Sequence, residues 1–343
     1  YFSRFLRHKR GFDKHGIFLL DQTHIVVPRN PRYEGVEYLR VDEFGHRIDT
    51  SGMSAEARKA IRPRPCYSFS ELVHVGKQDE CNVVAGYDWG GGKEDELVQG
   101  RRLVNTFVKA VGKGVMKLLI MDRGYIDGEF ISHVKQELDC DVLIPIRKNM
   151  QMLQFGIRQT KLKPAVGRWY KYREYRHDGE SYREDVFLIP DTYTWEECRV
   201  ELNLSLLRRR CLSSDNIDEQ HWGLASTHCP KSAKEAFEIY HLRTAIEERY
   251  RQHKHFWNLH KFSTPDKALM ETHVAFTLIT YTLLQLYLKK NHLSEMANKT
   301  LDNLKAKSQK GEDCVVVYKD TNFGVFNLDF YTEVIVDLDE SGR

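Results

Sequence analysis

Short apolar runs, bounded by polar or glycine-containing turns, dominate the chain up to residue 149. Five of them have the length and β-branched content of buried strands, and they span residues 17–27, 66–75, 82–87, 116–122 and 142–146. Residues 94–111 and 128–138 instead repeat their apolar positions at helical spacing. Three successive strands followed by alternating helices and strands predict an α/β fold with a mixed sheet, antiparallel at its first three strands.

The pattern changes after residue 149. Residues 150–220 contain short alternating runs, which predict a β-rich insertion. Residues 221–227 form another strand-like run that returns the chain to the core. The stretch 231–264 contains neither Gly nor Pro, and Ser232 followed by Glu235 gives it a capping-box start, so it predicts a helix.

These changes divide the chain into five segments. We expect residues 1–14 to be the end of a longer N-terminal region, because the chain begins at Tyr1 without Met. Residues 15–149 and 221–291 are then two parts of one core, with residues 150–220 inserted between them. Residues 292–343 form a C-terminal tail, and the pattern indicates no role for it.

Two acids stand out in the predicted strands. Asp21 is the single acid of an apolar run, and a buried carboxylate needs a cation, a metal or hydrogen bonds to stay ionised. Asp122 ends the short run that precedes Arg123-Gly124-Tyr125, and ligands usually bind at the carboxyl ends of strands in α/β sheets. Four nearby acids lie beside turns or helix starts, so we interpret them as caps and turn residues: Asp88, Asp127, Asp139 and Asp141.

A third acid, Glu247, lies in the predicted helix among charged and phenolic side chains. Arg243 precedes it by four residues, and Tyr240 and Lys254 lie seven residues to either side. On a helix these offsets place all four side chains within a stripe of about 60°. The stripe has two interpretations: a solvated salt-bridge face, or a metal-binding carboxylate flanked by phosphate-binding groups.

The spacing of these residues resembles a known family. Tyr240, Arg243, Glu247 and Lys254 reproduce the pattern Y-x2-R-x3-E-x6-K of the DDE transposases of bacterial insertion sequences, IS-four type. Asp21-Gln22-Thr23 and Asp122-Arg123-Gly124-Tyr125 match the family's first-acid and second-acid motifs. The resemblance implies an RNase H-like fold, with a mixed five-stranded sheet flanked by helices and a β-rich insertion between the second Asp and the Glu.

The resemblance also implies a metal-dependent DNA-cleaving enzyme. Asp21, Asp122 and Glu247 would hold two Mg²⁺ ions, with Mn²⁺ as a substitute. The implied reaction is cleavage at the transposon ends by water, followed by attack of the freed 3′-hydroxyl on target DNA. Double-stranded DNA is the implied partner, bound by a homodimer. Two alternatives stay open: a nuclease of the same core without strand transfer, and a non-catalytic DNA-binding derivative.

Several residues are implied to contact DNA. Tyr240, Arg243 and Lys254 would bind phosphates at the cleaved end, and Trp222 would stack on a base flipped out of it. The stretch 147–176 has nine basic residues and one acid, interleaved with aromatic side chains, which suits a phosphate backbone and unstacked bases; an ordinary antiparallel sheet with a polar face is the alternative. Arg147 and Lys148 begin this stretch. Which of the two touches DNA stays open, because Pro145 stands near the position where the family often has Arg.

Composition and charge limit the class of protein further. A net charge of +3 is too small to identify a nucleic-acid partner by itself. The seven cysteines are odd in number and contain no C-x2-C pair, which argues against a disulfide framework or a zinc ribbon. No apolar run reaches the length of about 18 residues that a membrane span needs, and no signal peptide is present, so we expect a cytoplasmic protein without a membrane association.

Overall fold

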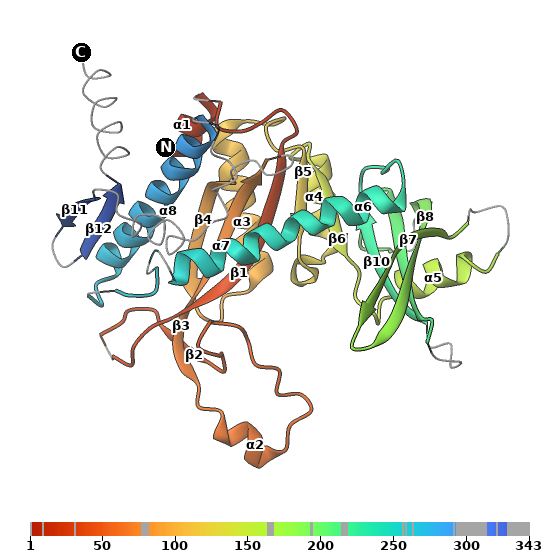
Figure 1. Cartoon of the computed structure of the whole chain (residues 1–343), viewed down its shortest axis with the longest axis horizontal. Helices are drawn as coiled ribbons and strands as arrows, with labels where there is room; N and C mark the ends of the chain where they lie inside the picture. The colour runs from red at the N-terminus through yellow and green to blue at the C-terminus, as the bar shows by residue number, and fades with distance from the viewer. Residues whose placement is uncertain are drawn as a thin grey trace.

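The computed structural model of the chain describes residues 2–8, 10–30, 32–76, 82–162, 168–192, 195–213, 219–255, 257, 259–262, 264–290, 292, 314–319 and 322–327. Its main feature is one mixed sheet of ten strands with helices on both faces (Figure 1). Within these ranges, no helix is both long and apolar enough to cross a membrane.

Five strands form the part of the sheet that the apolar runs predict. They are β1 (Ile17–Val26), β3 (Arg64–Val75), β4 (Val83–Gly91), β5 (Leu118–Met121) and β6 (Asp141–Pro145). The central strand β1 is antiparallel to β3 and parallel to β5. On the outside, β4 pairs antiparallel with β3, and β6 pairs parallel with β5. The resulting order β4-β3-β1-β5-β6 is compatible with an RNase H-like fold.

The insertion lengthens this sheet. It contributes β7 (Tyr170–His177), β8 (Glu180–Thr192) and β9 (Leu202–Cys211), and β10 (Gln220–Ser226) follows. β10 pairs antiparallel with β6, and β9, β8 and β7 continue outward in that order. With the short β2 (Glu37–Leu39) on β3, the sheet has ten strands, so it extends beyond the five strands predicted for the core. The reason is that β10 takes up the hydrogen bonds of the β6 edge, and the inserted strands pair onto β10.

Two helical layers cover the sheet. One contains α3 (Glu96–Val111), α4 (Gly128–Gln136) and α5 (Gln151–Gln159), and packs on Phe18 and Leu20 of β1. The other contains α6 (Ala233–Tyr240), α7 (Thr244–His255) and α8 (Lys267–Lys290), and packs on Leu19 and Ile25. Successive strand residues point to opposite faces, so β1 serves both cores. In Figure 1, α6 and α7 follow one another across the front of the sheet.

The remaining elements lie around these layers. α1 (Phe2–His8) packs against α3, and α2 (Ala55–Ala60) lies in the long connection between β2 and β3. β11 (Cys314–Lys319) and β12 (Asn322–Asn327) pair into a separate two-stranded sheet. The domain limits that the sequence suggests stay a prediction, because the ten-stranded sheet runs through them without a break.

The helix that carries Glu247 has two parts rather than one. Ser232 caps its start as predicted, because its hydroxyl accepts the Glu235 N–H at 3.2 Å. The helix then tightens into a 3₁₀ turn, η2 (His241–Arg243), before α7 begins. There the Thr244 hydroxyl donates to the His241 carbonyl at 2.9 Å. The turn separates Tyr240 from Glu247, so the predicted stripe does not follow one regular helix.

Candidate active site

The two aspartates lie side by side on neighbouring parallel strands, Asp21 in the middle of β1 and Asp122 directly after the end of β5. Leu20 of β1 pairs in register with Met121 of β5, so the next residues along the two strands are Asp21 and Asp122. Both continue the alternation of side chains that contribute to the core beneath α7. The sheet therefore presents two carboxylates on the face that α7 covers.

Local contacts fix each aspartate. The Asp122 side chain accepts the Arg123 N–H at 2.7 Å and so caps η1 (Arg123–Tyr125), the 3₁₀ turn that follows β5. Asp21 is held through its backbone, because the buried Tyr250 hydroxyl donates to the Asp21 carbonyl oxygen. That hydroxyl also accepts the Glu71 N–H at 3.3 Å. Tyr250 thus attaches α7 to β1 and β3 beside the first acid.

Arg243 joins all three acids. Its Nη2 lies 3.4 Å from Oδ2 of Asp21 and 3.1 Å from Oδ2 of Asp122, and its Nη1 lies 2.6 Å from Oε1 of Glu247. Residues from β1, the end of β5, η2 and α7 therefore meet at one guanidinium. The carboxylates predicted from the sequence converge in space.

The acids differ in their exposure to solvent. The exposed fraction of the side chain is 13% for Asp21, 37% for Asp122 and 58% for Glu247, so the cluster opens toward solvent on the side of α7. Burial raises the pKa of the Asp21 carboxyl to about 7, although Arg243 acts in the opposite direction. Burial also raises the pKa of the nearby Tyr240 phenol well above its usual value. The negative charge of Asp21 is thus costly even though the Arg243 guanidinium contacts it.

The donor set fits a hard divalent cation. It consists of carboxylate oxygens, the ligands that Mg²⁺ and Mn²⁺ prefer. Arg243 acts as a stand-in, because one cationic group already contacts all three acids. In the described part of the chain, no three Asp, Glu, His or Cys side chains are arranged to bind a metal ion directly. The guanidinium lies between the carboxylates, so it has to move aside before they can share a metal.

A comparison with models of protein families identifies the family of this chain. A family model described as "Transposase DDE domain" matches residues 13–283. The chain belongs to this DDE transposase family. The matched span contains the three converging acids and the insertion. Membership of the family supports a DNA-cleaving enzyme that depends on divalent metals, and it implies DNA as the partner. A search of curated proteins finds no match.

Lys254 lies on α7 seven residues after Glu247, but it makes its contacts inside the protein. Its side chain is buried, and its Nζ donates to the Thr23 hydroxyl at 2.7 Å and to the Phe44 carbonyl. Burial lowers the pKa of the Lys254 ammonium to about 8. In this transposase the lysine therefore joins α7 to β1 and to the loop after β2, and its side chain is buried, whereas that of Glu247 is 58% exposed.

The other predicted DNA-contacting residues lie around the acids at different places. Arg147 is exposed and donates from Nε and Nη2 to the Arg123 carbonyl at 3.3 and 3.2 Å, directly beside Asp122. Lys148 follows it and is also exposed. Trp222 lies on β10, with the Arg209 guanidinium 4.7 Å from its ring centre. Over the described ranges, no contact connects Trp222 to the three acids.

Glu96 is not among the residues that the sequence pattern singles out. It is the first residue of α3, after the N-cap Asp95, and such acids are usually helix-start residues. Its carboxylate lies against Gly124 of η1, where an added Cβ would be 2.1 Å from Oε1 of Glu96. Burial raises the pKa of Glu96, Arg47 lowers it, and Asp122 raises it. A fourth carboxylate thus lies beside the turn that carries Asp122.

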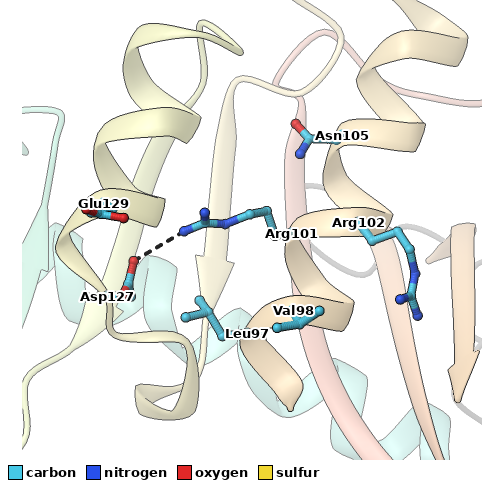
Figure 2. A pocket seen from close by; sticks show the side chains of 7 residues that line it. All are labelled: Leu97, Val98, Arg101, Arg102, Asn105, Asp127 and Glu129. Atoms are coloured by element: carbon cyan, nitrogen blue, oxygen red, sulfur yellow. Dashed lines mark hydrogen bonds and ion pairs between the residues drawn. The ribbon is translucent and has the colours of Figure 1, made fainter. Parts of the chain in front are cut away.

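A shallow pocket elsewhere on the transposase is not the candidate site. It lies between α3 and α4, on the opposite face of the sheet from α7 (Figure 2). Arg101 crosses it to Asp127 at 3.4 Å, while Asp127 also caps α4 as the sequence predicts, by accepting the Phe130 N–H at 2.7 Å. None of the three acids lines this pocket.

Proposed function

We propose that this DDE transposase is of the IS-four type and catalyses cut-and-paste transposition. It would cleave DNA at the transposon ends and join the freed 3′-hydroxyl to target DNA. The observation that carries the proposal is the convergence of Asp21, Asp122 and Glu247 on one guanidinium. Acids brought together from two strands and a helix need a shared cation, and phosphodiester chemistry uses such cations.

Asp21, Asp122 and Glu247 would hold two Mg²⁺ ions, which Mn²⁺ can replace. When bound, such ions stabilise the attacking and the leaving oxygen of an in-line displacement at phosphorus. The chain itself orients the carboxylates. Tyr250 holds the Asp21 backbone, and the 3₁₀ turn after Asp122 holds the second acid.

The cationic and aromatic residues would bind the DNA. Once displaced from the acids, Arg243 is free to bind a phosphate at the cleaved end, with Tyr240 beside it. Arg147 is held next to Asp122 and is better placed than Lys148 to contact the same strand near the cut. Trp222 would stack on an unpaired base, and Lys254 would support the site from within the protein through Thr23 and Phe44. The bound species would be a homodimer on double-stranded DNA.

The test is a cleavage and joining assay with the full chain. The substrate is DNA from both sides of the gene, which contains the ends of the element, together with a target plasmid and Mg²⁺. We expect cut ends and joined products from the wild type. Asp122→Asn should lose both by about 100-fold or more, corresponding to about 3 kcal/mol of transition-state stabilisation.

Asp88→Asn is the matched control. Asp88 is an acid on β4 that pairs with Arg102 at 2.6 Å, away from the cluster, so this variant should keep its activity. Equal cutting by wild type and Asp122→Asn contradicts the proposal. Cutting without joined products supports the simpler nuclease, and DNA binding without cutting supports a non-catalytic derivative.

A further inference from the structure

Two adjacent acids of the insertion are almost completely buried. Glu184 and Asp185 are each 1% exposed, although they lie on β8 near the outer end of the sheet. Because successive strand residues point to opposite faces, the two carboxylates lie on opposite faces of the sheet. Buried carboxylates are retained only with strong partners, so each face must supply cations.

Glu184 lies in a row that crosses three strands. Arg173 of β7 and Arg209 of β9 are its direct partners in register. Arg173 donates from Nε at 2.6 Å, Arg209 donates from Nε at 3.0 Å, and the Tyr175 hydroxyl donates at 3.1 Å. Burial raises the pKa of Glu184, but these donors outweigh it and leave the pKa lowered. The carboxylate is therefore ionised and fixes both arginines.

The two arginines keep donors available for a ligand. Their side chains are 48% and 33% exposed, against 1% for Glu184. Each guanidinium has five N–H donors, whereas one carboxylate accepts about four hydrogen bonds in all. The Arg173–Glu184–Arg209 row therefore has one excess positive charge and unused donors that reach solvent.

The row lies beside aromatic rings on the catalytic face. Arg209 packs 4.7 Å from the ring centre of Trp222, and Arg173 packs 5.5 Å from that of Tyr172. Both rings join the core that includes Leu19 of β1 and residues of α7, so they share the face of Asp21 and Asp122. Tyr172 also approaches Phe237 of α6, 6.3 Å between ring centres, and α6 leads directly to Arg243.

We propose that Arg173 and Arg209, positioned by Glu184, bind phosphates of an unpaired DNA strand whose base stacks on Trp222. This rests on the proposed function and adds the residues that hold the strand. Planar guanidinium groups suit phosphate oxygens, and aromatic rings beside them suit unstacked bases of any sequence. The row thus extends the DNA-binding surface from the acids along α6 to the insertion.

The opposite face offers a matched control. There Asp185 pairs with Arg183 at 2.8 Å, Arg210 at 2.6 Å and Arg208 at 3.4 Å, and Glu219 takes a further contact with Arg208 at 3.3 Å. Arg210 directly follows Arg209 in β9 and also pairs with a buried acid. It differs in facing away from the catalytic acids. Arg210→Gln therefore tests the loss of one positive charge without any change to the Arg173–Glu184–Arg209 row or to Trp222.

The experiment measures binding of a fluorescein-labelled oligothymidylate by polarisation, with the full chain in EDTA over a range of salt concentrations. We expect the double variant Arg173→Gln/Arg209→Gln to bind at least tenfold more weakly. Its slope of log K against log salt should be smaller by about 0.7 for each phosphate that the variant no longer binds. Trp222→Phe should weaken binding about fivefold or more without changing that slope. Arg210→Gln should match the wild type.

Glu184→Gln separates positioning from net charge. The variant is more positive, so simple attraction makes it bind the oligonucleotide more tightly, whereas loss of arginine positioning makes it bind more weakly. We expect weaker binding, with Asp185→Asn unchanged or tighter. Arg209→Lys keeps the charge and the pairing but loses the planar group. It should weaken binding of the oligonucleotide with an unchanged salt slope. This conservative variant tests the inference if the other variants do not fold.

Three results overturn the inference: tighter binding by Glu184→Gln, equally weakened binding by Arg210→Gln and the double variant, or wild-type affinity in folded Arg209→Lys. Because no metal is present, the binding assay is independent of cleavage. A protein that cuts DNA but shows any of these results refutes only the inference. A protein that binds as expected but does not cut refutes only the proposed function.

Discussion

Arg243 contacts Asp122 at 3.1 Å through the same nitrogen that faces Asp21 at 3.4 Å. An internal cation thus offsets part of the negative charge of the acidic cluster in the metal-free protein. It occupies the position between the carboxylates that a bound metal requires. Metal binding and the Arg243 contacts therefore compete, which gives the first prediction.

Arg243→Gln should bind divalent cations more tightly. The variant removes the competing guanidinium, and a tenfold gain corresponds to about 1.4 kcal/mol. The measurement is a calorimetric titration with Mn²⁺ in the absence of DNA. Arg251→Gln is the control, since Arg251 lies on the same helix but pairs with Glu248 at 2.6 Å. Weaker Mn²⁺ binding by Arg243→Gln would mean that the arginine assists the metal instead of replacing it.

The stability of the metal-free protein should depend on the ionisation of Asp21. Its pKa is raised from 3.8 to about 7 in the folded protein, so the folded state holds this proton more tightly than the unfolded state. The stability that this carboxyl contributes is present below pH 4 and is lost as the pH rises to about 7. The loss amounts to a few kcal/mol at most, at about 1.4 kcal/mol per pKa unit.

Urea unfolding in EDTA between pH 5 and pH 8 measures this effect. Asp21→Asn cannot ionise, so its stability relative to wild type should rise with pH over this range. Excess Mg²⁺ should remove the difference in pH dependence by stabilising the ionised carboxylate. Parallel pH profiles of the two proteins in EDTA would show that Asp21 is ionised throughout.

Lys254 should contribute little to the salt dependence of DNA binding. Its ammonium is bonded to Thr23 and Phe44 inside the protein, so it does not displace a counterion from a DNA phosphate. The salt slope of Lys254→Met should therefore equal that of the wild type. The exposed Lys148 is the comparison, and Lys148→Met should reduce the salt slope on duplex DNA by up to about 0.9 if it touches one phosphate. A reduced slope for Lys254→Met would indicate that the lysine turns outward when DNA binds.

Gly100→Ala should destabilise the protein, against the usual preference of helices for Ala. Helix propensity alone favours Ala by about 1 kcal/mol. Gly100 packs on the buried Tyr125, and an added Cβ would be 2.4 Å from Cε1 of that ring. Overpacking of this kind costs about 1–3 kcal/mol and would shift the turn that holds Asp122.

Chemical denaturation of Gly100→Ala measures the net effect. Gly52→Ala is the control, because no atom lies within 4 Å of its added Cβ, and it should stay within about 0.5 kcal/mol of wild type. Increased stability of Gly100→Ala would show that Tyr125 can move without cost.

The sequence predicted the features that depend on short-range pattern. Apolar runs located β1, β3, β4, β5 and β6, and Ser232 and Asp127 cap the helices as expected. The convergence of Asp21, Asp122 and Glu247 could be anticipated because their motifs resemble a known family. Local periodicity alone does not bring three distant acids together.

Long-range pairing accounts for what the sequence did not predict. Glu184 and Arg209 are opposite one another only because β8 and β9 pair in one register, and no local spacing encodes that contact. Lys254 is buried because the loop around Phe44 folds over it. The 3₁₀ turn at His241–Arg243 is a further feature that the sequence pattern did not indicate.

The central claim is that Asp21, Asp122 and Glu247 share divalent cations. Anomalous diffraction at the manganese edge, from crystals of the full chain grown with Mn²⁺, tests it most directly. We expect peaks in contact with all three carboxylates and the Arg243 guanidinium displaced from them. Mn²⁺ bound only elsewhere, with Arg243 still joining the three acids, would contradict the claim.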